Sequence, residues 1–113
     1  GATLHHIKPH GALYNDIAKS EHLANVFLRA ISTYKDKVIL YVPYGSVIEL
    51  LAKANNFSIM KEAFADRNYN NDLSLVSRKQ DNALISNVKD VLEHLVLMIP
   101  FVFMAIHRQL FKF

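Results

Sequence analysis

The chain contains no cysteine among its 113 residues. It therefore has neither a disulfide framework nor a thiolate zinc site, and a reducing compartment is permitted. The first ten residues are polar and rich in histidine, so no signal-peptide pattern opens the sequence. These absences favour a cytoplasmic protein.

Long apolar runs and an excess of one charge are also scarce. Residues 95–106 are uncharged, but a membrane-spanning helix needs roughly 20 apolar residues, and Pro100 interrupts this run. We expect a buried helix end followed by a buried strand there, and no membrane partner. The net charge of +3 comes from scattered residues without a basic stripe, so no nucleic-acid partner is expected.

Several motifs of common enzyme classes are missing as well. We find no nucleophile elbow, phosphate-binding P-loop or dinucleotide fingerprint, and no internal repeat or flexible linker. The composition, 51% hydrophobic and 20% charged, is typical of a soluble globular protein. The length fits one domain or part of one.

Apolar residues recur at helical spacing in three stretches. Ser20 can cap the first helix, Ser46 precedes the second, and Asn87 can cap the last, with Asp90 at the position of a capping-box acid. The expected helices extend to Tyr34, to Asn55–Asn56 and to Met98. The second would bury an apolar side made of Val47, Ile48, Leu50, Leu51 and Ala54.

Strands are expected at residues 3–8, 38–42, 57–65 and 83–86, and again after the last helix. A turn is expected over Pro9–Asn15, because proline fixes φ and Gly11 permits backbone angles that a Cβ would forbid. The alternation predicts an α/β protein with parallel strands joined by helices, and with ligand groups at the carboxyl ends of the strands.

The segment His5–Asn15 concentrates imidazole, amine, phenol and carboxamide groups. In an extended chain His6, Lys8 and His10 would share one face. Shared metal binding by the two histidines is awkward, because four residues of strand separate their Cα atoms by about 13 Å. A clamp for an anionic substrate or oxyanion fits better, and a hydrogen-bonded polar strand end is the structural alternative.

A second polar segment follows the strand expected at 57–65. Arg67 could bind a carboxylate or phosphate with its two-pronged guanidinium, and Asp66 could orient a base or accept a proton. Asp72 and Arg78 could form an ion pair that orders the loop. The alternative is a surface turn with solvated charges.

Together the two segments resemble the LamB/YcsF family. The motifs are HIKPHGALYN at His6–Asn15 and EAFADRNY at Glu62–Tyr69, followed by Asp72 and Arg78, with Pro43–Ser46 between them. We expect residues 1–113 to form a single partial domain of this family. The resemblance covers about residues 1–98, and residues 99–113 diverge from the family pattern. It implies part of a distorted (β/α) barrel of the glycoside hydrolase/deacetylase type.

The resemblance also implies an activity and a site. The family includes an ATP-dependent hydrolase that opens the lactam 5-oxoproline to L-glutamate with two partner subunits, and Mg²⁺ is expected with ATP. Carried over by position, the catalytic candidates are Lys8, His10, Asp66 and Arg67, and the substrate-binding candidates are Tyr14, Asn15, Tyr69, Asp72 and Arg78. Lys8 and Arg67 would hold carboxylate or phosphate, and His10 and Asp66 would move protons. No resident metal is expected.

The chain departs from the family pattern at three places. An acidic Asn-Cys-Asp motif that opens family members is missing, and so is a later His-Gly-Asp motif; Leu73 stands where glycine usually follows the aspartate. We therefore expect a fragment, or a reading whose end has left the family's register, and a chain that is inactive alone. Two alternatives stay open: a remnant or split subunit that only binds partner chains, and a metal-dependent carbohydrate deacetylase-like enzyme, which rests on fold analogy.

Overall fold

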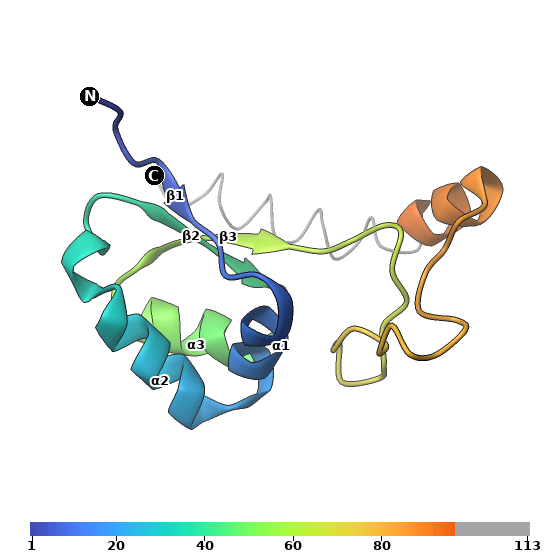
Figure 1. The fold of residues 1–113 in the computed structure, drawn as a ribbon, viewed down its shortest axis with the longest axis horizontal. Coiled ribbons are helices and arrows are strands. Elements are labelled where there is room, and N and C mark those ends of the chain that lie inside the picture. The colour runs from blue at the N-terminus through green and yellow to red at the C-terminus, as the bar shows by residue number, and fades with distance from the viewer. Residues whose placement is uncertain (97–113) are drawn as a thin grey trace. The chain divides into compact units, whose positions relative to one another are not determined.

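A computed structural model of the chain describes residues 1–96 (Figure 1). The chain divides into two compact units, and each is described by itself. The first comprises residues 1–62 and 71–74, and the second comprises residues 63–70 and the chain from residue 75 onward. The expected end of the last helix at Met98 and the strand expected beyond it lie outside the described residues.

The first unit is built on a parallel sheet of three strands in the order β1–β2–β3. Its strands are β1 (His6–Ile7), β2 (Ile39–Pro43) and β3 (Ser58–Glu62). Ile7 pairs with Leu40, and Leu40 pairs with Ile59. The predicted parallel α/β arrangement is confirmed, although β1 is shorter than the expected strand at 3–8 because its pairing with β2 begins only at the carbonyl of His5.

Three helices, α1 (Gly11–Lys19), α2 (Glu21–Ala30) and α3 (Val47–Ala54), lie on one side of this sheet (Figure 1). The turn expected over Pro9–Asn15 is wrong beyond its first residues, because a helix begins at Gly11. Gly11 has φ +62, a conformation that glycine adopts without a steric penalty, and the chain changes direction there. The helix then buries Tyr14 and Ile17.

The predicted helix starts at Ser20 and Ser46 are confirmed. Each hydroxyl accepts a hydrogen bond from the backbone N–H three residues on, at 3.2 Å in both cases. Helix α2 ends at Ala30, and a short 3₁₀ turn, η1 (Ser32–Tyr34), continues to the expected end. Helix α3 ends in a Schellman motif, in which Asn56 has φ 61 and the Phe57 N–H donates to the Ala52 carbonyl.

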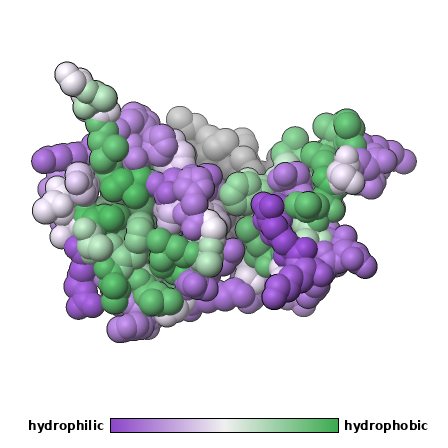
Figure 2. All heavy atoms as spheres, viewed as in Figure 1, coloured by the Kyte–Doolittle hydropathy of each residue, from purple (hydrophilic) through white to green (hydrophobic). Residues whose placement is uncertain are grey.

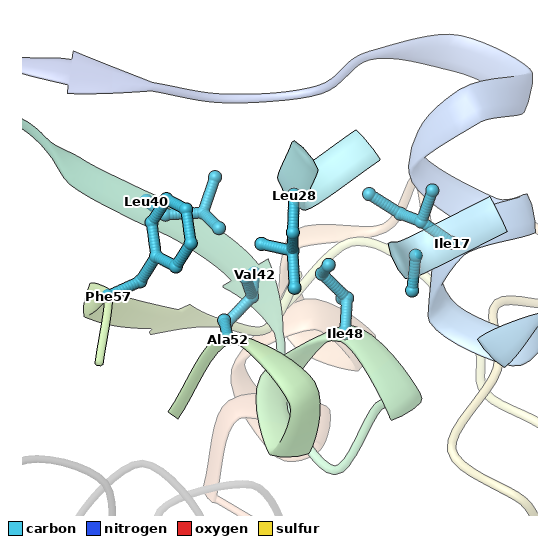
Figure 3. Close-up of a cluster of buried hydrophobic side chains, with 8 residues drawn as sticks. Ile17, Leu28, Leu40, Val42, Ile48, Ala52 and Phe57 are labelled. Carbon is cyan, nitrogen blue, oxygen red and sulfur yellow. The ribbon is translucent and has the colours of Figure 1, made fainter. Parts of the chain in front are cut away.

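The core of the first unit lies between the sheet and the helices (Figure 3). Strand β2 supplies Leu40 and Val42, and the surrounding buried residues are Ile17, Ala24, Leu28, Ile48, Ala52 and Phe57. The apolar side predicted for α3 is partly wrong. Leu50 is 68% exposed, and Glu49 is buried in its place because three hydrogen-bond donors satisfy its carboxylate.

The second unit contains loops and a helix over residues 88–96. The Asn87 side chain accepts a hydrogen bond from the Lys89 N–H at 2.8 Å, which confirms the predicted cap. The short strand expected at 83–86 is reduced to an isolated bridge between Arg67 and Leu84, since this stretch pairs through single hydrogen bonds such as Ile85 N–H to the Asp66 carbonyl.

Both units carry exposed apolar side chains (Figure 2). On the helix over residues 88–96 the exposed ones are Val88, Leu92, Leu95 and Val96. No helix within residues 1–96 is long and apolar enough to cross a membrane.

Candidate functional site at the carboxyl edge of the sheet

The three parallel strands bring polar groups to one edge of the sheet. Lys8 follows β1, the loop Tyr44–Ser46 follows β2, and Glu62 is the last residue of β3. Because parallel strands end on the same side, these groups gather where ligands bind in open α/β sheets. Polar groups thus follow β1, β2 and β3, as the alternation of strands and helices predicted, and a function for them stays a prediction.

Lys8 forms an ion pair with Glu62 at this edge. Its Nζ donates to Glu62 Oε1 at 2.7 Å, and the two side chains are only 25% and 16% exposed. Glu62 opens the second sequence motif, yet sequence reasoning gave it no role in the site. The available signal was its position at the end of a strand in the same parallel sheet as Lys8.

The shared strand face expected for His6, Lys8 and His10 is wrong for His10. His6 stacks on Tyr41 with ring centroids 4.6 Å apart, on the face of the sheet opposite Ile7 and the core. Strand β1 ends at Ile7, so strand alternation no longer governs His10. His10 is instead the exposed N-cap residue of α1, and its side chain makes no cap hydrogen bond.

Helix α1 places the other candidates of the first motif. Tyr14 is buried on the same side of α1 as Ile17. Asn15 is exposed, and its Nδ2 donates to the Gly11 carbonyl at 3.3 Å. Their assignment as substrate-binding residues stays a prediction.

A buried carboxylate holds the loop after β2. Glu49 accepts hydrogen bonds from the Gly45 N–H at 2.7 Å, from Lys53 at 3.0 Å and from Lys61 at 2.9 Å. Burial, the largest single effect, raises its pKa, but the hydrogen bonds from Lys61, Lys53 and Gly45 together outweigh burial and lower the pKa of Glu49 below its ordinary value. Lys61 also lies 5.5 Å from the Tyr44 ring centroid.

The loop that carries Asp72 belongs to the first unit. The Asp72 carboxylate accepts hydrogen bonds from the Ser74 hydroxyl and the Ser74 backbone N–H, and these bonds, aided by the charge of Lys19, lower its pKa. Leu73, at the position where glycine was expected from the family pattern, has φ 66. Leu73 therefore adopts the positive φ that glycine usually supplies in such a turn.

The second unit holds Asp66 and Arg67. Asp66 is exposed, and the Arg67 Nη2 donates to the Val76 carbonyl at 3.0 Å. The Arg67 Nε is buried without a hydrogen-bond partner among the described residues. This bond ties the guanidinium to Val76, whose N–H donates to the Asn68 carbonyl.

Tyr69 and Arg78 complete the predicted set. The Tyr69 hydroxyl accepts a hydrogen bond from the Phe64 N–H at 2.7 Å, and its ring stacks on His94. Arg78 is exposed. Since Arg78 and Asp72 fall in different units, the ion pair between them stays a prediction.

No site for a resident metal is evident in the part of the chain that the structure describes. There, no three side chains of histidine, aspartate or glutamate come together in a way that could hold a metal ion. A shallow hollow of about 420 Å³ lies in the second unit, and Asn68, Asn87 and Asp90 are among its lining residues. It includes none of the predicted catalytic or substrate-binding residues.

The fold and this edge define an α/β protein with a parallel sheet and paired charges where its strands end. The LamB/YcsF family model matches residues 1–106, somewhat further than the end near residue 98 that the motifs indicated. The chain belongs to the LamB/YcsF family.

Known relatives agree with this membership. The chain is 39% identical over 99 residues to a Tolumonas auensis protein named as the A subunit of 5-oxoprolinase, a match that covers 88% of this chain and 39% of that protein. It is 36% identical over 100 residues to the protein of the same name from Bacillus cereus strain AH187. The chain thus spans about 40% of the length of these relatives.

A solved structure shares the fold. The lactam utilization protein from Thermus thermophilus superimposes with a TM-score of 0.69 at 28% sequence identity. The superposition covers 83% of this chain and 38% of that protein. The chain therefore matches a segment of a larger fold of this family.

Proposed function

We propose that this chain is part of the A subunit of an ATP-dependent 5-oxoprolinase, which opens the lactam 5-oxoproline to L-glutamate with two partner subunits. The family and the names of its relatives support this activity. One structural observation supports the activity at the level of residues. The Lys8 ammonium is held by Glu62 at the edge of the sheet where the strands end. The exposed apolar side chains of the helix over residues 88–96 suit a chain that is covered by further protein.

A lactam is a stable amide, so its ring opens only after activation. ATP, with Mg²⁺ on its phosphates, would supply that activation by phosphorylating the lactam oxygen. The ammonium of Lys8 and the guanidinium of Arg67 are donors suited to carboxylate or phosphoryl oxygens. His10 and Asp66, both exposed, would move protons to and from the attacking water and the ring nitrogen.

The proposal is tested by glutamate release. The full-length subunit, purified with both partner subunits, should release glutamate from 5-oxoproline only when ATP and each partner are present. The 113-residue chain assayed alone should release none. Release that is unaffected by omitting ATP or a partner would contradict the proposal.

The alternatives give different results in the same preparation. A remnant that only binds partners would co-purify with them and release no glutamate. A deacetylase-like enzyme would contain a transition metal whose removal abolishes an activity on acetylated sugars. Either result would replace the oxoprolinase assignment.

A further inference from the structure

The ion pair between Lys8 and Glu62 joins two strands that do not touch each other. Lys8 follows β1 and Glu62 ends β3, while β2 lies between these strands. Glu62 is paired in register with Pro43, the last residue of β2. The contact of 2.7 Å therefore crosses the end of β2 and fixes the Lys8 ammonium at the carboxyl edge.

Burial distinguishes this pair from an ordinary surface contact. Lys8 and Glu62 are 25% and 16% exposed, whereas the pair of Lys89 and Glu93 has a separation of 4.0 Å and exposures of 81% and 64%. Exposed pairs gain little because water screens them and both long side chains must be ordered. A short, largely buried pair can hold a flexible lysine in one position.

Among the described residues, the Glu62 carboxylate bonds to Lys8 alone. Its Oε1 accepts a hydrogen bond from the Lys8 ammonium, and its Oε2 is buried without a hydrogen-bond partner among the described residues. The carboxylate of the buried Glu49, by contrast, is held by three donors. Removing the Glu62 charge should therefore act first on the position of Lys8.

We propose that Glu62 is a positioning residue for Lys8, an inference that rests on the proposed function. An ammonium has three N–H donors, so Lys8 can bind Glu62 and an anionic oxygen of the substrate together. The ligand chemistry at this position is a carboxylate, a phosphoryl oxygen or the oxyanion that develops on the lactam carbonyl. Lys8 acts there as a fixed cation and hydrogen-bond donor.

The first test uses the 113-residue chain and needs no activity. Lysine side-chain ¹⁵N–¹H NMR should show that Glu62→Gln shifts or broadens the Lys8 ammonium signal and leaves the Lys89 signal in place. The matched control, Glu93→Gln, should leave the Lys8 signal in place. A Lys8 signal that Glu62→Gln does not change would overturn the inference.

The second test uses the full-length subunit with its partners. Glu62→Gln should lower kcat/KM for 5-oxoproline by about 10²-fold, since a displaced catalytic group costs about that much. Glu62→Asp keeps the charge and should recover part of the loss, and Glu93→Gln should retain the wild-type value. Thermal melts followed by circular dichroism show whether each variant is folded.

A double-mutant cycle separates positioning from a structural role. Lys8→Ala should lower kcat/KM strongly in the wild type but by no more than about threefold when Glu62→Gln is already present. Fully additive losses, or a Glu62→Gln variant at the wild-type kcat/KM, would overturn the inference and leave the proposed function intact. A wild-type complex that releases no glutamate with ATP would overturn both.

Discussion

The Leu73 side chain fills the space beside Gly45 that a Cβ would need. Leu73 Cδ1 lies 2.7 Å from the position of an ideal Cβ on Gly45, and both residues have positive φ, 66° and 70°. The contact joins the loop that carries Asp72 to the loop after β2. A leucine at positive φ is unfavourable by itself, so packing against Gly45 offsets part of its backbone cost.

Gly45→Ala should destabilise the chain by about 1–3 kcal/mol, because the new methyl group meets Leu73 and alanine disfavours positive φ. Urea unfolding followed by circular dichroism measures this loss. The double variant Gly45→Ala/Leu73→Gly removes the collision and should be less destabilised than Gly45→Ala alone. Equal losses in both variants would show that Leu73 does not pack there.

Glu49→Ala should lower the free energy of unfolding by about 3–5 kcal/mol, because it leaves the ammonium of Lys61 buried without its carboxylate. Lys61 is only 4% exposed. Lys53→Met is the matched control, since Lys53 is 31% exposed and pairs with the same carboxylate. The control should lower the free energy of unfolding by no more than about 1 kcal/mol. A loss in Lys53→Met as large as that in Glu49→Ala would contradict the prediction that the buried pair of Glu49 and Lys61 matters more.

The stabilising effect of Glu49 should depend on pH. Its pKa is lower in the folded chain than the ordinary value of 4.5, so the folded state favours the ionised carboxylate. That contribution is fully present above pH 4.5 and is lost as the pH falls through the lower folded pKa. The difference in unfolding free energy between wild type and Glu49→Gln should therefore be constant near neutral pH and shrink in acid. A difference that grows below pH 4.5 would contradict the lowered pKa.

Local signals in the sequence predicted most of the first unit. Serine caps at Ser20 and Ser46 and the apolar run in β2 identify their elements because these preferences act within a few residues. Helix α1 was missed since Pro9 and Gly11 together are typical of a turn. Here Gly11 only redirects the chain, and burial of Tyr14 and Ile17 sustains the helix that follows.

The site required information that is not local. The motifs indicated Lys8, but its partner Glu62 lies 54 residues further along the chain and is adjacent only because both strands belong to one parallel sheet. The burial of Glu49 could not be predicted either, because its partners come from other elements. A glutamate beside Leu50 on a helix is usually exposed, and only Lys61 on β3 and the Gly45 N–H make its burial favourable.

The proposed function assigns lactam opening to the charged groups of Lys8 and Asp66. The most direct measurement is the initial rate of ATP-dependent glutamate release from 5-oxoproline by the full-length subunit with both partners, for wild type, Lys8→Ala and Asp66→Ala. We predict losses of about 10²-fold or more in both variants, as expected when an oxyanion donor or proton-transfer group is removed. Wild-type rates in both variants would contradict the site assignment.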